Sequence, residues 1–311
     1  MGKIVVVGSS NTDMIVNVRE MPRAGETVLG GTFFMAAGGK GANQAVAAAR
    51  AGGDVTFVGC VGADLFGRQA VQQLTDDGID TGFVFTEEGA ASGVALILVD
   101  GTGENSIAVA AGANAMLRPA HLVRAEPAIR AADALVLQLE TPLETVEAAA
   151  RMAAERGVKV ILNPAPAQPL DRELLRHVSI LTPNETEAEA LTGVGIGDDA
   201  SLNEAASVLL SAGPDAVLIT LGAHGVFVAT AGVRERVPGI GVRAVDTTAA
   251  GDVFNGALAA ALTEDRPLLE AVRFANAAAA LSVTRLGAQP SVPHREEISS
   301  LLSGNGHVAI D

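Results

Sequence analysis

The sequence is poor in several residue types that mark particular classes of protein. Its 311 residues include no tryptophan, no tyrosine and a single cysteine, Cys60. One cysteine rules out an intrachain disulfide and fits a reducing compartment, and we expect Cys60 to be a small buried hydrophobic residue. No apolar run approaches the roughly 18 residues that span a bilayer, and the apolar run at the amino terminus is too short for a signal peptide. These absences predict a soluble, cytoplasmic protein.

Positive charge is also scarce. The chain has 21 lysines and arginines against 36 aspartates and glutamates, a net charge of −15, and no basic run. Because nucleic-acid backbones are bound by clustered basic residues, DNA and RNA are excluded as partners. The same negative charge repels nucleotide phosphates, so an anionic substrate needs local hydrogen-bond donors and a divalent cation.

What the sequence does contain is an alternation of short apolar strands with longer alanine-rich helical patterns. Hydrophobic residues make up 49% of the chain and charged residues 18%, as in a soluble globular protein. IVVVG near the amino terminus reads as a first buried strand. From about residue 120 the strand-like runs are ALVLQLE, VKVILNPAP, VSILTPNE and AVLITLG, the last followed by a hairpin-like stretch. This order predicts a mostly parallel sheet covered by helices.

Polar residues recur where these strands end. Each one alone is more simply a turn or cap residue. Ligands of such sheets bind beyond the carboxyl ends of the strands, however, so the repeated placement at one edge favours a binding site there. The residues are Asn11, Asp13, Glu140, Asn163, Asn184 and Gly222.

Two early stretches break the alternation. Residues 12–18 and 28–35 look like strands without a helix between them, and so do 92–99 and 104–110, which flank a turn at Asp100-Gly101. We predict that two inserts, at about 12–35 and 91–110, form a small β-sheet that covers the site as a lid. Such a sheet has one exposed apolar face unless another subunit covers it, so we predict a homodimer formed through the lid.

The stretch AVDTTAAGDVFNGALAAAL, residues 244–262, sets an acidic residue beside a loop suited to bind anions. Ala249, Ala250 and Gly251 leave backbone N–H groups uncovered at the start of a helix, where the helix dipole also favours a phosphate. Asp252 can then accept a proton from an attacking hydroxyl. The competing interpretation is that Asp252 only caps its own helix. The segment alone does not separate the two.

The stretch AAGGKGANQAVAAARAG, residues 36–52, places glycines before a second alanine-rich helix. Glycines let the backbone approach a ligand, and Lys40 and Asn43 can hydrogen-bond to several hydroxyls. The spacing is not that of a P-loop. A glycine turn that merely leads into a packed helix explains the same pattern.

The stretch TPNETEAE, residues 182–189, has two compatible interpretations. Thr182 and Glu185 have the spacing of a capping box, with Pro183 at the first helical position. Asn184 and Glu187 lie three residues apart, on one helical face, and can be directed at magnesium and phosphates.

Taken together, these segments resemble the phosphofructokinase B-type family of carbohydrate kinases, and within it the ribokinase branch. The resemblance runs from about residue 3 to residue 300. It rests on GSSNTD, on the signature regions GGKGANQAVAAARAG and AVDTTAAGDVFNGAL, and on LNPAPA, TPNETEAE, LITLGAHG and VTRLGAQPSVP. It implies a single domain over residues 1–311, folded as a ribokinase-like three-layer α/β/α sandwich with a mostly parallel central sheet and a small β-sheet lid.

The resemblance also implies roles for individual residues. Asp252 is the expected base for the 5-hydroxyl of the sugar, and Ala249, Ala250 and Gly251 form the anion hole. Those expected around the sugar are Asn11, Asp13, Gly39, Lys40, Asn43, Glu140 and Asp252. Those expected at the ATP site are Asn184, Thr220, Leu221, Gly222, Ala223, His224, Gly225, Gly251 and Asn276.

Two cations are implied. Glu187 is expected to organise Mg²⁺ through its waters, and a monovalent cation, K⁺, is expected beside the anion hole, bound in part by backbone carbonyls. The K⁺ positions are Asp246, Thr248, Ser282, Arg285, Gly287 and Ser291. Thr248 stands where the family commonly has isoleucine, and Asn276 where histidine is common, so the second change bears on nucleotide preference. Without tryptophan or tyrosine, aliphatic side chains must wall the adenine site.

The implied reaction is transfer of the γ-phosphoryl group of ATP to O5 of D-ribose, giving D-ribose 5-phosphate and ADP. Because its transition state is loose, a base with an ordinary pKa near 4 suffices. The alternatives are a related kinase of 2-deoxyribose, fructose or adenosine, and a non-catalytic sugar sensor. A dinucleotide-dependent oxidoreductase is rejected because the turn after the first strand reads GSSNTD and not G-x-G-x-x-G. We assign no function to the tail SGNGHVAID.

Overall fold

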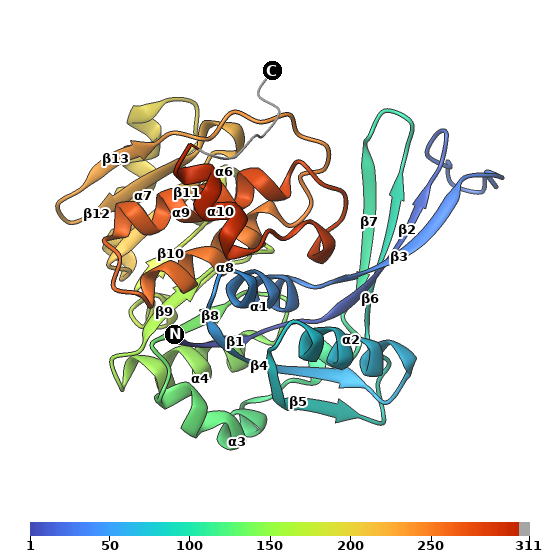
Figure 1. The fold of residues 1–311 in the computed structure, drawn as a ribbon, viewed down its shortest axis with the longest axis horizontal. Helices are drawn as coiled ribbons and strands as arrows, with labels where there is room; N and C mark the ends of the chain where they lie inside the picture. Colours follow the sequence, from blue (N-terminus) through green and yellow to red (C-terminus); the bar gives the residue numbers. More distant parts are fainter. Residues whose placement is uncertain (305–311) are drawn as a thin grey trace.

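The structure, a computed structural model, describes residues 1–304. The last seven residues of the tail SGNGHVAID therefore lie outside the described residues. A nine-stranded sheet forms the centre of the fold, and a separate four-stranded sheet stands off one side of it (Figure 1).

The central sheet has the order β13-β12-β11-β10-β9-β8-β1-β4-β5. All neighbours pair in parallel except β11 with β12 and β12 with β13, which form the hairpin predicted after AVLITLG. The strands are β1 Lys3–Val7, β4 Asp54–Gly62, β5 Asp80–Glu87, β8 Ala134–Leu137, β9 Lys159–Leu162, β10 Ile180–Leu181, β11 Ala216–Thr220, β12 Val226–Thr230 and β13 Arg234–Val237.

Helices cover both faces of this sheet, because its strands are apolar on both sides. In β1, Ile4 and Val6 pack in one core with α1, α8 and α9, whereas Val5 and Val7 pack in a second core with α3, α4 and α7. The predicted three-layer α/β/α sandwich is confirmed. The helices are α1 Lys40–Arg50, α2 Leu65–Asp76, α3 Pro119–Arg130, α4 Leu143–Ala154, α5 Arg172–Leu175, α6 Glu185–Thr192, α7 Asp199–Ala212, α8 Ala250–Leu262, α9 Leu268–Ser282 and α10 Arg295–Leu302, with 3₁₀ turns η1 Gly112–Met116, η2 Gly222–His224 and η3 Gln289–Ser291.

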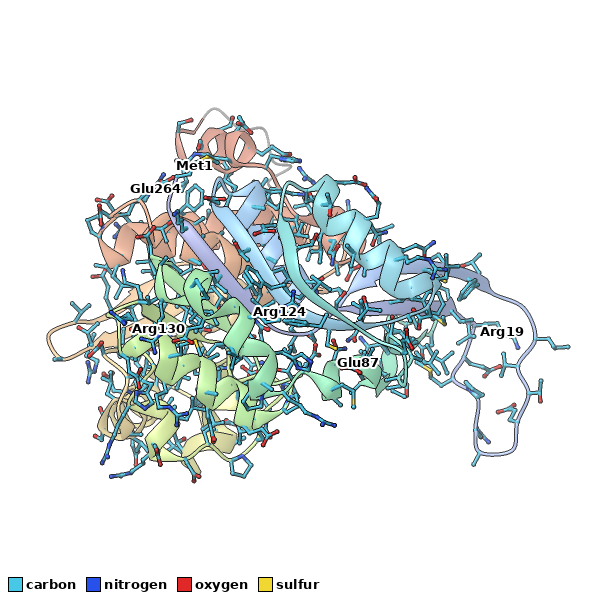
Figure 2. The ribbon with its side chains drawn as sticks, turned by 90° about the horizontal axis from the view of Figure 1, so that it is seen from below. Met1, Arg19, Glu87, Arg124, Arg130 and Glu264 are labelled. Carbon is cyan, nitrogen blue, oxygen red and sulfur yellow. The ribbon has the colours of Figure 1, made fainter. Side chains whose placement is uncertain are left out.

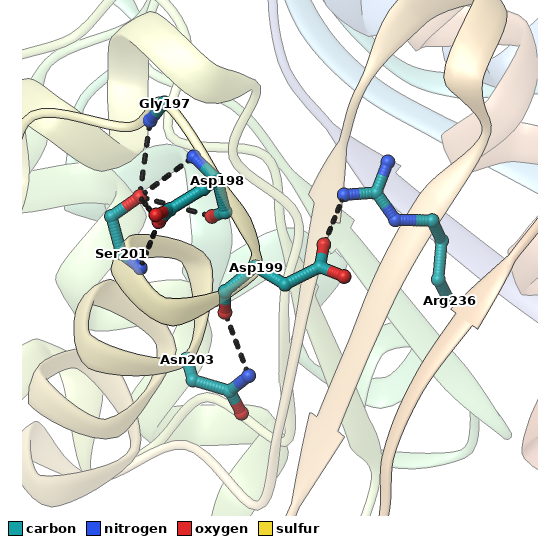
Figure 3. A network of polar contacts seen from close by, with 6 residues as sticks. All are labelled: Gly197, Asp198, Asp199, Ser201, Asn203 and Arg236. Atoms are coloured by element: carbon teal, nitrogen blue, oxygen red, sulfur yellow. Dashed lines mark hydrogen bonds and ion pairs between the residues drawn. The ribbon is translucent and has the colours of Figure 1, made fainter.

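Polar contacts connect the edge strand β13 to helix α7. Asp198 caps α7 by accepting a hydrogen bond from the backbone N–H of Ser201 (2.8 Å), and the next residue, Asp199, pairs with Arg236 of β13 (Figure 3). Both charges of this pair are largely exposed, so we expect it to orient β13 and to add little stability.

The second sheet is built from the two predicted inserts and has the order β3-β2-β6-β7. Its strands are β2 Asn11–Asn17, β3 Thr32–Gly38, β6 Gly93–Val99 and β7 Asn105–Ala110. The predicted strand at 28–35 is wrong in its first half. Gly30 and Gly31 have φ values of 97° and 111°, which a strand cannot continue through, so β3 begins only at Thr32.

Large apolar side chains are exposed on both faces of this sheet, which we call the lid, and not on one face as predicted. The strand register places Phe34, Ile107 and Val109 on the same face as Asp13, and Phe33, Met35 and Leu96 on the other. All six are 44% to 60% exposed. The loop that carries Arg19 at the tip of the lid projects far from the central sheet (Figure 2).

Within residues 1–304, no helix has both the length and the apolar character needed to cross a membrane.

Candidate active site

The polar residues predicted at one edge of the sheet do converge there. The helices α1 and α8 pack side by side, and each begins at this edge. Close packing depends on Gly256 of α8, because a Cβ there would collide with the backbone of Gln44 in α1. The amino-terminal ends of two helices therefore face the same region, which is also the root of the lid.

The start of α8 exposes backbone N–H groups that no side chain caps. Its N-cap is Ala249, which adopts the left-handed conformation with φ of 59°, and no side chain caps the helix. A non-glycine residue in this region is strained, and such strain commonly marks a functional turn. The first N–H groups of a helix have no partner within it. Apart from Gly251 itself, its chain neighbours and the adjacent backbone of α8, no atom of the described residues lies within 4 Å of a Cβ placed at Gly251, so a ligand can approach this turn.

Asp252 does not cap its own helix, so that interpretation is wrong. It is the third residue of α8 and only 5% exposed. Its Oδ2 accepts a hydrogen bond from Asn43 Nδ2 (3.0 Å) and its Oδ1 from Gln44 Nε2 (2.9 Å). Burial raises the pKa of Asp252 above its ordinary value, against the lowering effects of the Lys40 ammonium and of the two amide donors. The expectation of an ordinary pKa near 4 is therefore corrected upward.

Three of the residues predicted to surround the sugar are polar and buried. Asn11, Asp13 and Asn43 are 7%, 8% and 5% exposed, and Asn43 Oδ1 has no partner within residues 1–304. Glycine is required here. A Cβ at Gly38 would collide with the Asp13 carboxylate, and one at Gly39, whose φ is 88°, would collide with the backbone at Asn11.

Carboxylates crowd this region. The pKa of Asp13 is raised to about 7, chiefly by burial and further by the charges of Glu140 and Asp252. Glu140 also has a structural role: its Oε2 accepts hydrogen bonds from Ser9 Oγ (2.6 Å) and from the backbone N–H of Lys40 (3.0 Å), at the start of α1.

Lys40, predicted to lie near the sugar, also faces residues predicted to bind phosphate. It lines a cavity of about 180 Å³ together with Asn184, Glu187, Gly251 and Asp252. The charge of Asp252, and to a lesser extent those of Glu140 and Glu187, raises the pKa of the Lys40 ammonium against the opposing effect of burial. A permanent positive charge in this cavity suits a phosphate as well as a sugar hydroxyl.

The capping box of α6 is present, but it is not the predicted one. Asn184 is the N-cap: its Oδ1 accepts from the backbone N–H of Glu187 (2.7 Å), and Glu187 Oε2 accepts from that of Asn184 (2.8 Å). Thr182 instead donates to Asn255 Oδ1 (2.6 Å), and Pro183 precedes the helix. Both cap residues still line the cavity, so capping and ligand binding are compatible.

A second cavity, of about 290 Å³, adjoins the first at Gly251. Its walls are glycines and aliphatic residues with Phe254, and Asn276, Thr220, Gly222, Ala223 and Gly225 line it as predicted. Two residues predicted at the ATP site, Leu221 and His224, line neither cavity. The Leu221 side chain packs into the core of the opposite face, and His224 is exposed outside the cavity. Asn276 Nδ2 donates to the carbonyl of Pro238 (3.2 Å).

The residues predicted to bind K⁺ come from the loop before α8 and from the end of α9 with the segment that follows it, as far as η3. Asp246 joins them, because its Oδ1 accepts from the N–H of Thr248 (2.9 Å) and its Oδ2 from that of Gly287 (2.8 Å). These bonds hold the pKa of Asp246 below its usual value although burial raises it. Ser282 and Ser291 bond their hydroxyls to carbonyls of their own turns, and Arg285 pairs with Glu297.

A larger cavity, of about 910 Å³, lies between β3, α2 and the loop Leu286–Pro290. Arg50 lines this cavity. Its guanidinium group donates to both carboxylate oxygens of Asp77 (2.7 and 3.0 Å) and to the carbonyls of Gln289 and Val292. With this charge neutralised, the cavity lacks the free cationic donors of the smaller one.

Two functional side chains escape sequence reasoning. Asn114 of η1 accepts from the N–H of Ser10 (2.9 Å) and donates to Asn11 Oδ1 (2.7 Å), so it fixes the orientation of the Asn11 amide. Gln44 binds Asp252. Both are distant in sequence from the groups they hold, and each looks like an ordinary residue of a helical segment. The sequence gives one local indication of such a role: an amide side chain occupies a position that the surrounding alanines predict to be buried.

Comparison with known proteins agrees with this geometry. A family model described as "pfkB family carbohydrate kinase" matches residues 1–295. The ribokinase of Haemophilus influenzae is 48% identical over 299 residues, which cover 96% of this chain and 98% of that protein. The deoxyribokinase of Salmonella typhi is 38% identical, covering 97% and 99% of the two chains.

A solved structure shares the whole fold. Arabidopsis thaliana ribokinase, complexed with ribose and ATP, superposes with a TM-score of 0.92 at 35% identity and covers 97% of this chain and 98% of its own. The chain belongs to the pfkB family of carbohydrate kinases.

Proposed function

We propose that the chain is an ATP-dependent kinase that transfers the γ-phosphoryl group of ATP to O5 of D-ribose, forming D-ribose 5-phosphate and ADP. The observation that carries the proposal is the position of the buried Asp252 carboxylate in the first turn of α8, beside an uncapped helix start and next to the sugar-side amide of Asn43. The ribokinases similar to this chain over nearly its full length support ribose as the acceptor.

In the proposed reaction, the sugar lies on Asn11, Asp13, Asn43 and the backbone of Gly39, with O5 directed at Asp252. Asp252 accepts the proton of O5 as the O5–P bond forms and the bond from the γ-phosphorus to the bridging oxygen of ADP breaks. The N–H groups at Ala249 and Gly251 and the Lys40 ammonium stabilise the charge of the transferring group, together with the N–H of Ala250, which donates to the Thr247 carbonyl (3.3 Å) in this structure. Because the transition state is loose, positioning contributes more than early deprotonation.

ATP occupies the two adjoining cavities in this proposal, with adenine between the aliphatic walls near Asn276 and the phosphates near Asn184. No group of three or more histidine, cysteine or acidic side chains within residues 1–304 could hold a metal. Mg²⁺ is therefore expected to be held by phosphates and water, with Glu187 contacting its waters, and to neutralise phosphate charge.

K⁺ is expected between the loops that Asp246 joins, where carbonyls and the ionised carboxylate suit a monovalent cation. The contributing residues are Asp246, Thr248, Ser282, Arg285, Gly287 and Ser291.

We further propose a cytoplasmic homodimer formed through the lid, because a partner subunit would bury the apolar side chains that the lid exposes. The oligomeric state of Ile107→Asp and of Leu96→Asp, measured by sedimentation, tests which face of the lid is covered, because the two residues lie on opposite faces. If both variants remain dimeric, the dimer does not form through the lid.

The second candidate acceptor is 2-deoxyribose, favoured by the similarity to deoxyribokinase. The distinction depends on whether the site pairs the 2-hydroxyl, because a buried polar group left unpaired costs about 1–3 kcal/mol.

The test is ADP formation with Mg²⁺ and ATP on D-ribose, 2-deoxyribose, fructose and adenosine, in potassium and in sodium buffer. We expect D-ribose to have the highest kcat/KM and potassium to raise it. A higher value for 2-deoxyribose would transfer the assignment to that sugar. Sugar binding without ADP formation would identify a sensor.

A further inference from the structure

Gln44 has no part in the proposed reaction, yet it contacts the proposed base directly. It is completely buried in α1, immediately after Asn43, and does not line the cavity at Gly251. Its Nε2 donates to Asp252 Oδ1 (2.9 Å) and to Asn163 Oδ1 (3.2 Å). Since Asn43 binds Oδ2, each oxygen of the carboxylate accepts one amide hydrogen.

The Gln44 amide has only one satisfactory orientation. Its Oε1 accepts a hydrogen bond from Gln138 Nε2 (2.7 Å), and Gln138 is itself 1% exposed. A flipped amide would set Oε1 against the Asp252 carboxylate and its NH₂ against that of Gln138. The acceptors Asp252 Oδ1 and Asn163 Oδ1 at Nε2 and the Gln138 donor at Oε1 therefore fix the Gln44 amide together, although Gln138 Oε1 itself has no partner within residues 1–304.

The same polar network reaches the anion-binding turn from the other side. Asn163 Nδ2 donates to the carbonyl of Thr182 (3.1 Å), and the Thr182 hydroxyl donates to Asn255 Oδ1 (2.6 Å). Asn255 Nδ2 then donates to the carbonyl of Gly251 (2.8 Å), whose peptide bond carries the N–H of Asp252. Buried amides are costly unless fully paired, so this network stabilises one arrangement of the turn.

Charged groups face Asp252 from four directions. Lys40 of α1 favours the carboxylate anion, whereas Glu140 after β8, Asp13 of β2 and Glu187 of α6 oppose it. Burial and three acidic groups thus disfavour the Asp252 anion. The neutral N–H donors of Asn43 and Gln44 stabilise this anion without changing the net charge of the site.

We propose that Gln44 is a positioning residue for phosphoryl transfer, whose fixed amide holds the Asp252 carboxylate in one orientation and favours its anionic form without contacting either substrate. The inference rests on the proposed function. It predicts that removing the amide lowers turnover and shifts the acid limb of the rate profile, because the donor from Gln44 lowers the pKa of Asp252.

The experiment compares Gln44→Met with the wild-type enzyme in kcat, ribose KM and the pH dependence of kcat/KM. We expect kcat to fall about tenfold or more, since a hydrogen bond to a charged group contributes about 1.5–3 kcal/mol. Ribose KM should change less than about threefold, and the acid limb should move to higher pH. Gln44→Glu, which adds a carboxyl beside Asp252, should move the limb further in the same direction.

The matched control is Thr145→Val, which removes a buried hydrogen bond to the Leu117 carbonyl (2.7 Å) in α4, within the core of the opposite face. It should lower Tm but leave kcat and the acid limb unchanged. A double-mutant cycle adds the decisive comparison. In an Asp252→Asn background, Gln44→Met should cause little further loss, whereas the same fold-loss in both backgrounds would show a merely structural role and overturn the inference.

The outcomes separate the inference from the proposed function. If the wild-type chain forms no sugar phosphate, the proposed function fails. If it is active and Gln44→Met keeps both turnover and the acid limb, the inference alone fails. Should Gln44→Met not fold, Gln138→Met, which retains Gln44 but removes the donor to its Oε1, must shift the acid limb in the same direction, and an unshifted limb would overturn the inference.

Discussion

The two ends of the site are built from different parts of the polypeptide. At the sugar end of the proposed site, buried side chains carry the chemistry: Asp13, Asn43 and Asp252 are all buried, and the Asp252 carboxylate accepts hydrogen bonds from the amides of Asn43 and Gln44. At the nucleotide end, the turn Ala249–Gly251 and the glycine-rich walls present backbone to open space. In the proposed function, side chains select the sugar hydroxyls and accept the proton, whereas backbone N–H groups bind the phosphates and apolar walls bind the adenine. Substitutions should therefore affect turnover and sugar selection at the first end and nucleotide affinity at the second.

The largest effect should come from Asp252→Asn. This substitution keeps the shape of the side chain but removes the proton acceptor, so we expect kcat to fall by about a hundredfold or more. Ribose affinity, measured by calorimetry, should change little. Asp199→Asn, which alters an exposed aspartate far from the site, serves as control and should retain full activity. Turnover near the wild-type value in Asp252→Asn would remove Asp252 from the role of base.

Gly251→Ala tests the backbone half of the comparison. A Cβ there meets no described atom within 4 Å, so Tm should be nearly unchanged, but the methyl group occupies the approach of the phosphoryl group. We expect kcat to fall about tenfold or more, since misplaced anion-hole donors cost at least that much. Gly256→Ala, in the same helix, should show the opposite balance, with a marked loss of Tm from its collision with α1. Unimpaired turnover in Gly251→Ala would argue against phosphate binding at this turn.

The crowded carboxylates predict a pH effect on the sugar end. The pKa of Asp13 is raised to about 7 by burial and by Glu140 and Asp252, so the folded protein binds a proton here that the unfolded chain releases above its ordinary pKa of 3.8. Ionisation of Asp13 thus destabilises the fold as pH rises from about 4 to 7. Asp13→Asn should raise Tm at pH 8, and the gain should shrink toward pH 5.

The same variant should bind ribose more weakly, with KM raised about tenfold, because an amide replaces an anionic acceptor of two hydroxyls. In the wild-type enzyme, ribose KM should rise as pH falls through 7. A Tm gain independent of pH would show that the charge of Asp13 is not the cause.

The smallest effect is expected at Asn276. Its amide nitrogen is bound to the Pro238 carbonyl, so the side chain presents mainly its oxygen to the nucleotide cavity. Asn276→Ala should raise the KM for ATP by about two- to fivefold, the value of one exposed hydrogen bond, and leave kcat and ribose KM unchanged. A comparable change in ribose KM would contradict the separation of the two ends.

The parts of the site that sequence predicts well are those whose signal is local. Gly251 and Asp252 belong to one short segment in which small residues precede a helix, and the segment folds as that pattern indicates. The start of α6 was misplaced by two residues because Thr182 and Asn184 are equally good caps. The choice depends on Asn255, seventy-three positions away, which takes the Thr182 hydroxyl.

The buried amides could not have been predicted for the same reason. Gln44 follows Asn43 in an alanine-rich helix, and only the packing of α1 against α8 brings it to Asp252. In the lid, strand-like runs with no helical pattern between them correctly indicate strands, except at residues 28–31. The exposure of apolar side chains on both faces depends on the pairing register of β2, β3, β6 and β7 and on what packs against each face. The residue pattern within a single strand contains neither kind of information.

The parallel pairing of β2 with β6 has a consequence for the order of folding. Residues 11–17 align with 93–99, although β4, α2 and β5 of the central sheet lie between them in sequence. Closing so long a loop is entropically costly until the central sheet has already brought the two lid roots together. The lid should therefore be the last part to form and the first to open. In pulsed hydrogen exchange, we expect the amides of β2 and β6 to become protected after those of β1 and β8.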